Sequence, residues 1–190
     1  MNIIEKLFEG AEAELFLLDD GTILKKWKLK TPSNALELKK RIKKEISFRK
    51  GLNSQLPSLE TALLGFSFQE HYILLKRYSV VERTLTVLEQ MGNVLILLHN
   101  ASMVHGDPIF SNFVTSGNTF FPIDFTFSEV SCSKFSAYAR DLEVFKKNFL
   151  FVSDSKTAFL KFLDKYKEKV TKSERILLAF KYLQKQKRYV

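Results

Sequence analysis

The chain has 190 residues, a mass of 22.1 kDa and a formal net charge of +9, and 45% of its residues are apolar and 27% charged. This composition predicts a globular protein of one domain, or of two lobes that share a cleft, and excludes a disordered chain. The single cysteine, Cys132, excludes an internal disulfide and a multi-cysteine metal site, and no apolar run approaches the ~18 residues of a membrane span.

The N-terminal segment carries Glu5, Glu9 and Glu12 among its apolar residues, which is not typical of a signal peptide. We therefore expect a cytoplasmic and nuclear protein without membrane contact. Asp19-Asp20-Gly21 predicts a hairpin turn. Strands are predicted at five places in this half of the chain: residues 3–8, 13–18, 22–27, 59–68 and 72–75.

One long helix is predicted within the strand-rich half. Thr31-Pro32-Ser33-Asn34 indicates its start, with Ser33 or Asn34 as the cap, and Gly51 indicates its end. Glu45 lies at the edge of the apolar arc of this helix and is the only acid there, and Arg49 falls on the arc although the pattern offers no reason for it. The arc is formed by Ala35, Leu38, Ile42 and Ile46.

The second half of the chain is predicted to be mainly helical. A loop over residues 103–112 leads to two short strands, 113–115 and 120–123, around the turn Ser116-Gly117-Asn118. Helical spacing marks four segments: residues 87–99, 135–150, 155–169 and 172–188. The pattern changes near residues 76–80, so we expect an α+β fold with a strand-rich lobe over 1–75, a hinge over 76–80 and a helical lobe over 81–190.

Basic residues gather in two blocks. Residues 25–50 contain eleven basic residues and two acids, and residues 161–190 contain ten basic residues and three acids. Such runs are often solvated helix faces, but two separate blocks favour a polyanionic partner such as a nucleic acid.

Four signals occur in the order that protein kinases use. Lys25 lies on the third predicted strand, and Glu45 lies on the helix that follows. Because Glu45 is the only acid near the apolar arc, we expect it to point to the sheet and to form an ion pair with Lys25. Asp107 and Asn112 are five residues apart in a loop, and Asp124 ends an apolar strand. In kinases such residues bind phosphates, orient the lysine, accept the substrate proton and hold Mg²⁺.

Each of these residues alone has an ordinary explanation, such as a solvated lysine, a surface acid, a loop cap or a turn former. Phosphoryl transfer spreads negative charge over several oxygens, so the reaction needs a cation, a metal and positioned carboxylates together. The order, spacing and placement of the whole set therefore favour a kinase-like site.

The chain resembles a particular group of atypical kinases, the small kinase/ATPase subunit of the KEOPS (EKC) complex, known as the PRPK family. The resemblance covers about residues 9–150. Six motifs carry it: Gly10-Ala11-Glu12-Ala13, Arg41-x-x-x-Glu45, His105-Gly106-Asp107, Ser111-Asn112, Ile123-Asp124-Phe125 and Asp141-Leu142-Glu143-Val144.

This resemblance implies a minimal bilobal kinase fold that hydrolyses ATP with Mg²⁺ and phosphorylates itself and some proteins on serine or threonine. It also implies work beside a threonylcarbamoyl-transferase subunit and other KEOPS subunits, in a complex that makes threonylcarbamoyl-adenosine in tRNA; tRNA would bind the basic surface. By motif, Asp107 is the catalytic residue and Asn112 and Asp124 hold the metal. The resemblance also implies that the nucleotide is bound by Gly10, Ala11, Glu12, Ala13, Lys25 and Glu45.

Several features depart from ordinary kinases. Thr126 stands where the metal motif usually has glycine, and Pro108 follows the catalytic aspartate. Sixteen residues separate Asp124 from Asp141, with no Ala-Pro-Glu between them, so a peptide-binding platform is missing. ATP hydrolysis coupled to a partner fits this better than broad protein phosphorylation. Two alternatives stay open: a pseudokinase that acts as a scaffold, and a small-molecule kinase of the aminoglycoside or choline type.

Overall fold

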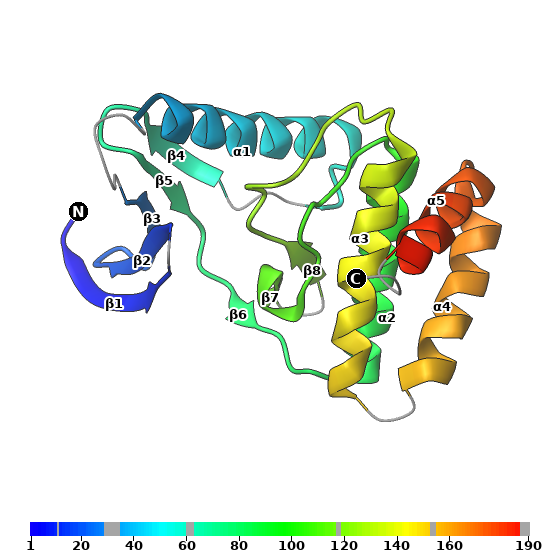
Figure 1. The fold of residues 1–190 in the computed structure, drawn as a ribbon. Coiled ribbons are helices and arrows are strands. Elements are labelled where there is room, and N and C mark those ends of the chain that lie inside the picture. Colours follow the sequence, from blue (N-terminus) through cyan, green and yellow to red (C-terminus); the bar gives the residue numbers. More distant parts are fainter. Residues whose placement is uncertain (11, 29–34, 60–62, 117–118, 153–154, 187–190) are drawn as a thin grey trace.

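The computed structural model describes residues 1–10, 12–28, 35–59, 63–116, 119–152 and 155–186. A sheet with one long helix forms one end of the molecule, and a bundle of helices forms the other, with a small second sheet between them (Figure 1). The predicted α+β class is confirmed. Within the described residues no helix combines the length and the apolar character that a membrane crossing requires.

The N-terminal sheet is antiparallel and has the strand order β1-β2-β3-β5-β4. Helix α1 (Ala35–Gln55) lies along one face of this sheet, as Figure 1 shows. Buried apolar residues from β3, β5 and α1, including Trp27, Ile42 and Ile73, form the core between them. The strands are β1 (Ile3–Glu9), β2 (Ala13–Leu18), β3 (Ile23–Trp27), β4 (Leu63–Ser67) and β5 (Tyr72–Leu75).

Two predicted boundaries in this part were wrong. The helix does not stop at Gly51 but continues to Gln55, because the next residue, Leu52, is fully buried in the core. This packing outweighs the cost of a glycine inside a helix, about 1 kcal/mol. The strand predicted over 59–68 includes neither Leu59 nor Phe68 and is described as Leu63–Ser67, while residues 60–62 lie outside the described residues. The predicted helix start at residues 31–34 lies outside the described residues.

The helical part matches its prediction closely. Its core is aromatic: Phe145 contacts Phe149 and Phe162 edge to face, and Phe162 in turn lies beside Tyr166. Thr84 caps the first helix of this part, α2, by accepting a hydrogen bond from the Val87 N–H. The helices are α2 (Leu85–Asn100), α3 (Phe135–Asn148), α4 (Ser155–Lys169) and α5 (Ser173–Gln186).

The second sheet joins the two ends of the molecule. It has the order β6-β7-β8, with β6 (Ser79–Val80), β7 (Phe113–Ser116) and β8 (Thr119–Pro122). β6 falls inside the predicted hinge and pairs with β7, so the end of that segment is attached to the C-terminal part. The division into lobes at residues 76–80 stays a prediction. The turn residues 117 and 118 lie outside the described residues.

Candidate active site

Lys25 reaches the site because of the alternation of side chains along β3. It pairs with Leu15 of β2 and Ile73 of β5, and its side chain turns to the α1 face, whereas the next residue, Lys26, is exposed. There the Lys25 Nζ atom lies 3.1 Å from Oε2 of Glu45, which is fully buried. The ion pair expected from the position of Glu45 on the helix is therefore present.

Arg49 is a part of the site whose role was missed by the sequence analysis. Its Nη2 atom lies 2.7 Å from Oε1 of Glu45, and its guanidinium carbon lies 4.8 Å from the ring centre of Phe125. Glu45 thus has one cation on each oxygen. The signal was available, because an arginine four residues after a glutamate lies on the same helix face and pairs with it.

Asp124 completes a charged cluster that links the two parts of the molecule. Its Oδ1 atom lies 2.8 Å from Lys25 Nζ and accepts a hydrogen bond of 2.8 Å from the Thr126 hydroxyl. Thr126, the residue in place of the usual glycine, therefore helps to hold the carboxylate. Asp124 has a φ of 57°, a conformation that aspartate adopts more readily than most residues.

The contacts of the cluster favour its charged forms. Burial disfavours the ammonium of Lys25, but Glu45 and Asp124 outweigh burial, so its pKa is raised above 10.5. Burial likewise disfavours the carboxylate of Asp124, but the charge and hydrogen bond of Lys25, with help from Thr126, lower its pKa below 3.8.

The candidate catalytic loop is held by its own asparagine. The Nδ2 atom of Asn112 donates to the backbone oxygen and to Oδ2 of Asp107, both at 2.9 Å. Burial raises the pKa of Asp107 above 3.8, although His105 and the bond from Asn112 oppose the shift. Asp107 is thus fixed in direction and is a stronger base than an exposed aspartate.

The loop is also anchored from behind. Asp141 accepts hydrogen bonds from the backbone N–H groups of His105, at 2.8 Å, and Gly106, at 2.7 Å. The His105 ring is buried beside the rings of Phe113 and Phe125. Asp141 belongs to one of the motifs found in the sequence, but the motif alone does not reveal that this carboxylate binds the loop.

The two candidate metal ligands are brought together by the β7–β8 hairpin. Phe113 pairs with Pro122, and the Ile123 N–H donates to the Asn112 carbonyl at 2.8 Å, so Asn112 and Asp124 lie at neighbouring ends of the two strands. A carboxylate and an amide oxygen suit Mg²⁺, which commonly takes its other ligands from phosphates and water. The part of the chain that is described has no cluster of three or more His, Cys, Asp or Glu residues that could hold a metal ion.

The loop between β1 and β2 is attached to α1. Glu12 accepts a bond of 2.6 Å from Nη1 of Arg41, and the Gly10 N–H donates to the Ala13 carbonyl at 2.9 Å. Arg41 also pairs with Glu37 on its own helix. Ala11 lies outside the described residues. A nucleotide role for Gly10, Glu12 and Ala13 stays a prediction.

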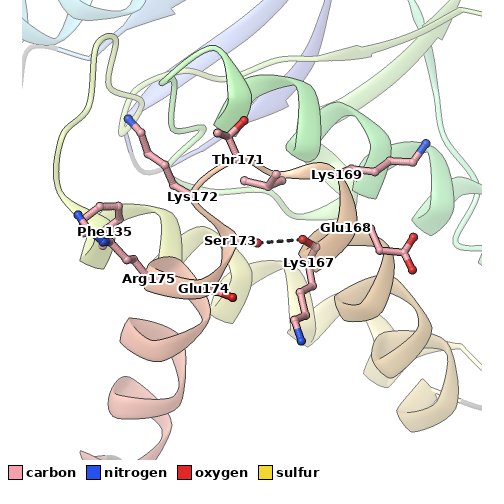
Figure 2. A pocket seen from close by; sticks show the side chains of 10 residues that line it. Phe135, Lys167, Glu168, Lys169, Thr171, Lys172, Ser173, Glu174 and Arg175 are labelled. Atoms are coloured by element: carbon pink, nitrogen blue, oxygen red, sulfur yellow. Dashed lines mark hydrogen bonds between the residues drawn. The ribbon is translucent and has the colours of Figure 1, made fainter.

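A cavity lies elsewhere, at the turn between α4 and α5 (Figure 2). It has a volume of about 590 Å³ and is lined by Phe135 and residues 167–175. Lysine and glutamate side chains point away from one another around it, and the Ser173 hydroxyl donates to the Lys167 carbonyl. None of the residues predicted for the active site lines it.

Comparison with known proteins identifies the fold. No protein-family model matches the chain, and no curated protein matches it in sequence. Among solved structures it is similar to the Rio2 kinase of Chaetomium thermophilum, solved as an ADP/Mg²⁺-phosphoaspartate complex, with a TM-score of 0.57 and 16% identity over 100% of this chain and 72% of that chain. The chain therefore has the fold of an atypical kinase, as the sequence predicted, while its place in the PRPK family is not shown.

The geometry of Gly106 leads to a first prediction. Gly106 has a φ of 90°, and a Cβ there would lie 2.4 Å from the backbone of Phe127. Gly106→Ala should therefore lower the free energy of unfolding by about 3 kcal/mol or more, from strain and overpacking combined. Gly21→Ala is the control, because Gly21 has a φ of 80° but open space around it, and should cost only about 1 kcal/mol. Equal losses in urea denaturation would contradict the close contact.

The Lys25–Asp124 pair gives a prediction about pH. A lowered carboxylate pKa adds stability that is present above 3.8 and is lost as pH falls through the folded-state value. A raised lysine pKa adds stability that is present below 10.5 and is lost as pH rises through the folded-state value. The advantage in unfolding free energy of wild type over Asp124→Asn should therefore shrink as pH falls below 3.8 and as it rises above 10.5. A difference that increases in favour of wild type at acid pH would contradict the pair.

Proposed function

We propose that this chain is an ATP-hydrolysing atypical serine/threonine kinase that serves as the kinase subunit of a KEOPS complex and supports threonylcarbamoyl-adenosine formation in tRNA. The observation that carries the proposal is the Lys25 ammonium, which contacts both Glu45 and Asp124. In kinase chemistry a lysine so placed binds phosphates, while the glutamate orients it and the aspartate holds metal. The Rio2 kinase of similar fold was solved with ADP and Mg²⁺, which supports the same ligands here.

Each residue has a task that its contacts support. Lys25 would bind the phosphates of ATP, held in direction by Glu45, which Arg49 fixes in turn. Asp107 would accept the proton of the attacking water or hydroxyl, since its raised pKa makes it a better base. Asp124 and the amide oxygen of Asn112 would hold Mg²⁺, which when bound neutralises charge on the phosphates.

Hydrolysis beside a partner is supported by the short segment after Asp124. Phe125 is buried, the Ser128 N–H donates back to the Phe125 carbonyl, and Glu129 pairs with Val104. Helix α3 then begins at Phe135. The described segment is thus folded against the catalytic loop and offers no platform for a peptide. We infer that a protein partner, the threonylcarbamoyl-transferase subunit with the other KEOPS subunits, uses the ATP turnover.

The central test is Asp107→Asn. The amide has the same shape, and Asp107 orients the nucleophile rather than the metal, so the fold and ATP affinity should stay nearly unchanged. The rate of ATP hydrolysis should fall by roughly 10² to 10⁴, the usual effect of losing a positioned general base. The rate should be measured together with the melting temperature on the same preparation.

Asp124→Asn is the matched variant, because it should also weaken Mg²⁺-dependent nucleotide binding. Full turnover in well-folded Asp107→Asn protein would remove the enzymatic role of this loop and leave the scaffold hypothesis. An inactive wild-type chain that still binds its partner would do the same. Phosphorylation of an aminoglycoside or choline at a rate above that of ATP hydrolysis would instead favour the small-molecule kinase.

A tRNA partner is supported by the exposed lysines of α1. Lys39, Lys43 and Lys50 lie on one stripe of the helix, and all three are exposed. Phosphate contacts release counterions, so tRNA affinity should fall steeply with salt. Changing Lys39 and Lys43 to Glu should weaken tRNA binding and flatten its salt dependence. The double change of Lys134 and Lys147, which are exposed outside both basic blocks, is the charge-matched control. Equal effects of the two variants would show nonspecific attraction only.

A further inference from the structure

A chain of buried polar contacts lies behind the candidate catalytic loop. Asp141, in the middle of α3, accepts hydrogen bonds from the backbone of His105 and Gly106. Its Oδ2 atom also lies 3.2 Å from Nε2 of His99, near the end of α2. The Nδ1 atom of His99 lies 2.5 Å from the hydroxyl of Tyr166, on α4. The Asp141 carboxylate therefore connects α3 to the loop and to α2, and His99 extends the connection to α4.

The three side chains in this series of contacts are shielded from water. Asp141 and Tyr166 are 0% exposed and His99 is 4% exposed. Buried polar atoms need protein partners, because an unsatisfied group costs about 1–3 kcal/mol. The hydrogen bonds of each member therefore constrain its neighbours, and the orientation of Asp141 depends on what His99 offers to it.

One placement of the hydrogen atoms on His99 and Tyr166 gives every polar contact among Asp141, His99 and Tyr166 both a donor and an acceptor. The carboxylate of Asp141 can only accept, so Nε2 of His99 carries a hydrogen and donates it. Burial raises the pKa of the Tyr166 phenol, so this group keeps its proton. The phenol can then donate to Nδ1, provided that Nδ1 is bare, as it is in a neutral imidazole. A doubly protonated ring would place an N–H against the hydroxyl and leave the phenol proton without this acceptor.

We propose that His99 and Tyr166 are positioning residues for the catalytic loop: Tyr166 holds His99 as the neutral Nε2–H form, and His99 holds Asp141 in the orientation that binds the His105 and Gly106 amides. This inference rests on the proposed function only for its effect on the rate. The placement of the loop is a structural claim that can be tested without any activity.

The chain offers a matched control for Tyr166. The ring of Tyr138 contacts the same histidine edge to face, with 4.9 Å between ring centres, and its hydroxyl is also buried. That hydroxyl donates to the Cys132 carbonyl and not to His99. Tyr138→Phe therefore removes one buried phenol hydrogen bond beside His99 but leaves the contacts from Tyr166 through His99 to Asp141 intact.

The first measurement is nuclear magnetic resonance of the full chain without nucleotide. In wild type, the ¹⁵N shifts of His99 should show the neutral Nε2–H form. In Tyr166→Phe the Nδ1 shift should move toward that of an unbonded nitrogen, and the His105 and Gly106 amides should exchange with solvent faster. Tyr138→Phe should change neither. Wild-type shifts of a doubly protonated His99, or unchanged amide exchange in Tyr166→Phe, would overturn the proposal.

The second measurement is steady-state ATP hydrolysis. Tyr166→Phe should lower kcat by about 10-fold with little change in KM for ATP, because a displaced base affects the chemical step more than binding. His99→Gln, whose amide can still donate to Asp141, should keep more activity than His99→Leu. Equal kcat losses in Tyr166→Phe and Tyr138→Phe would show a merely structural role. If wild type is inactive, the proposed function fails, while the exchange measurement still decides the positioning claim.

Discussion

The arrangement of this protein depends on one ammonium group that lies between two carboxylates from distant parts of the chain. Lys25 comes from the N-terminal sheet, Glu45 from the helix on that sheet, and Asp124 from the end of the β7–β8 hairpin. Removing these charges from water costs several kcal/mol per ion, so the cluster holds only because each group has close partners. The contact therefore connects the sheet to the helical part through charge, at the candidate active site.

Arg49 extends this buried charged cluster toward the aromatic core. It puts a second cation on Glu45 and lays its guanidinium against Phe125, the residue that follows Asp124. Phe125 in turn contacts Phe48 of α1 and His105 of the catalytic loop. A polar cluster and an aromatic cluster thus share Arg49 and Phe125. A substitution of Arg49 or Phe125 should therefore disturb both the candidate site and the core next to it.

The helices and strands were predicted well because the spacing of apolar residues and the presence of turn-forming residues are local features of the sequence. The sequence also predicted the pair of Lys25 and Glu45, since strand alternation and the helical wheel give directions to side chains. It misplaced the end of α1, because Leu52, which follows Gly51, is fully buried in a core formed by parts of the chain far away in sequence. The roles of Asp141 and Tyr166 could not be predicted for the same reason, because their partners are known only once the helices are packed. The pair of Arg49 with Glu45 is different, since the two residues are four apart on one helix and the sequence held that signal.

The contact between Gly106 and Phe127 bears on how such a protein could be regulated. Many kinases carry an arginine at this point of the loop, and a phosphate added to the activation segment is read by arginine in that way. Here the backbone of Phe127 occupies the space that any side chain at position 106 would need. A phosphate on the short segment would find no cation from this position to receive it. A cation that receives such a phosphate would have to come from another part of the fold than position 106.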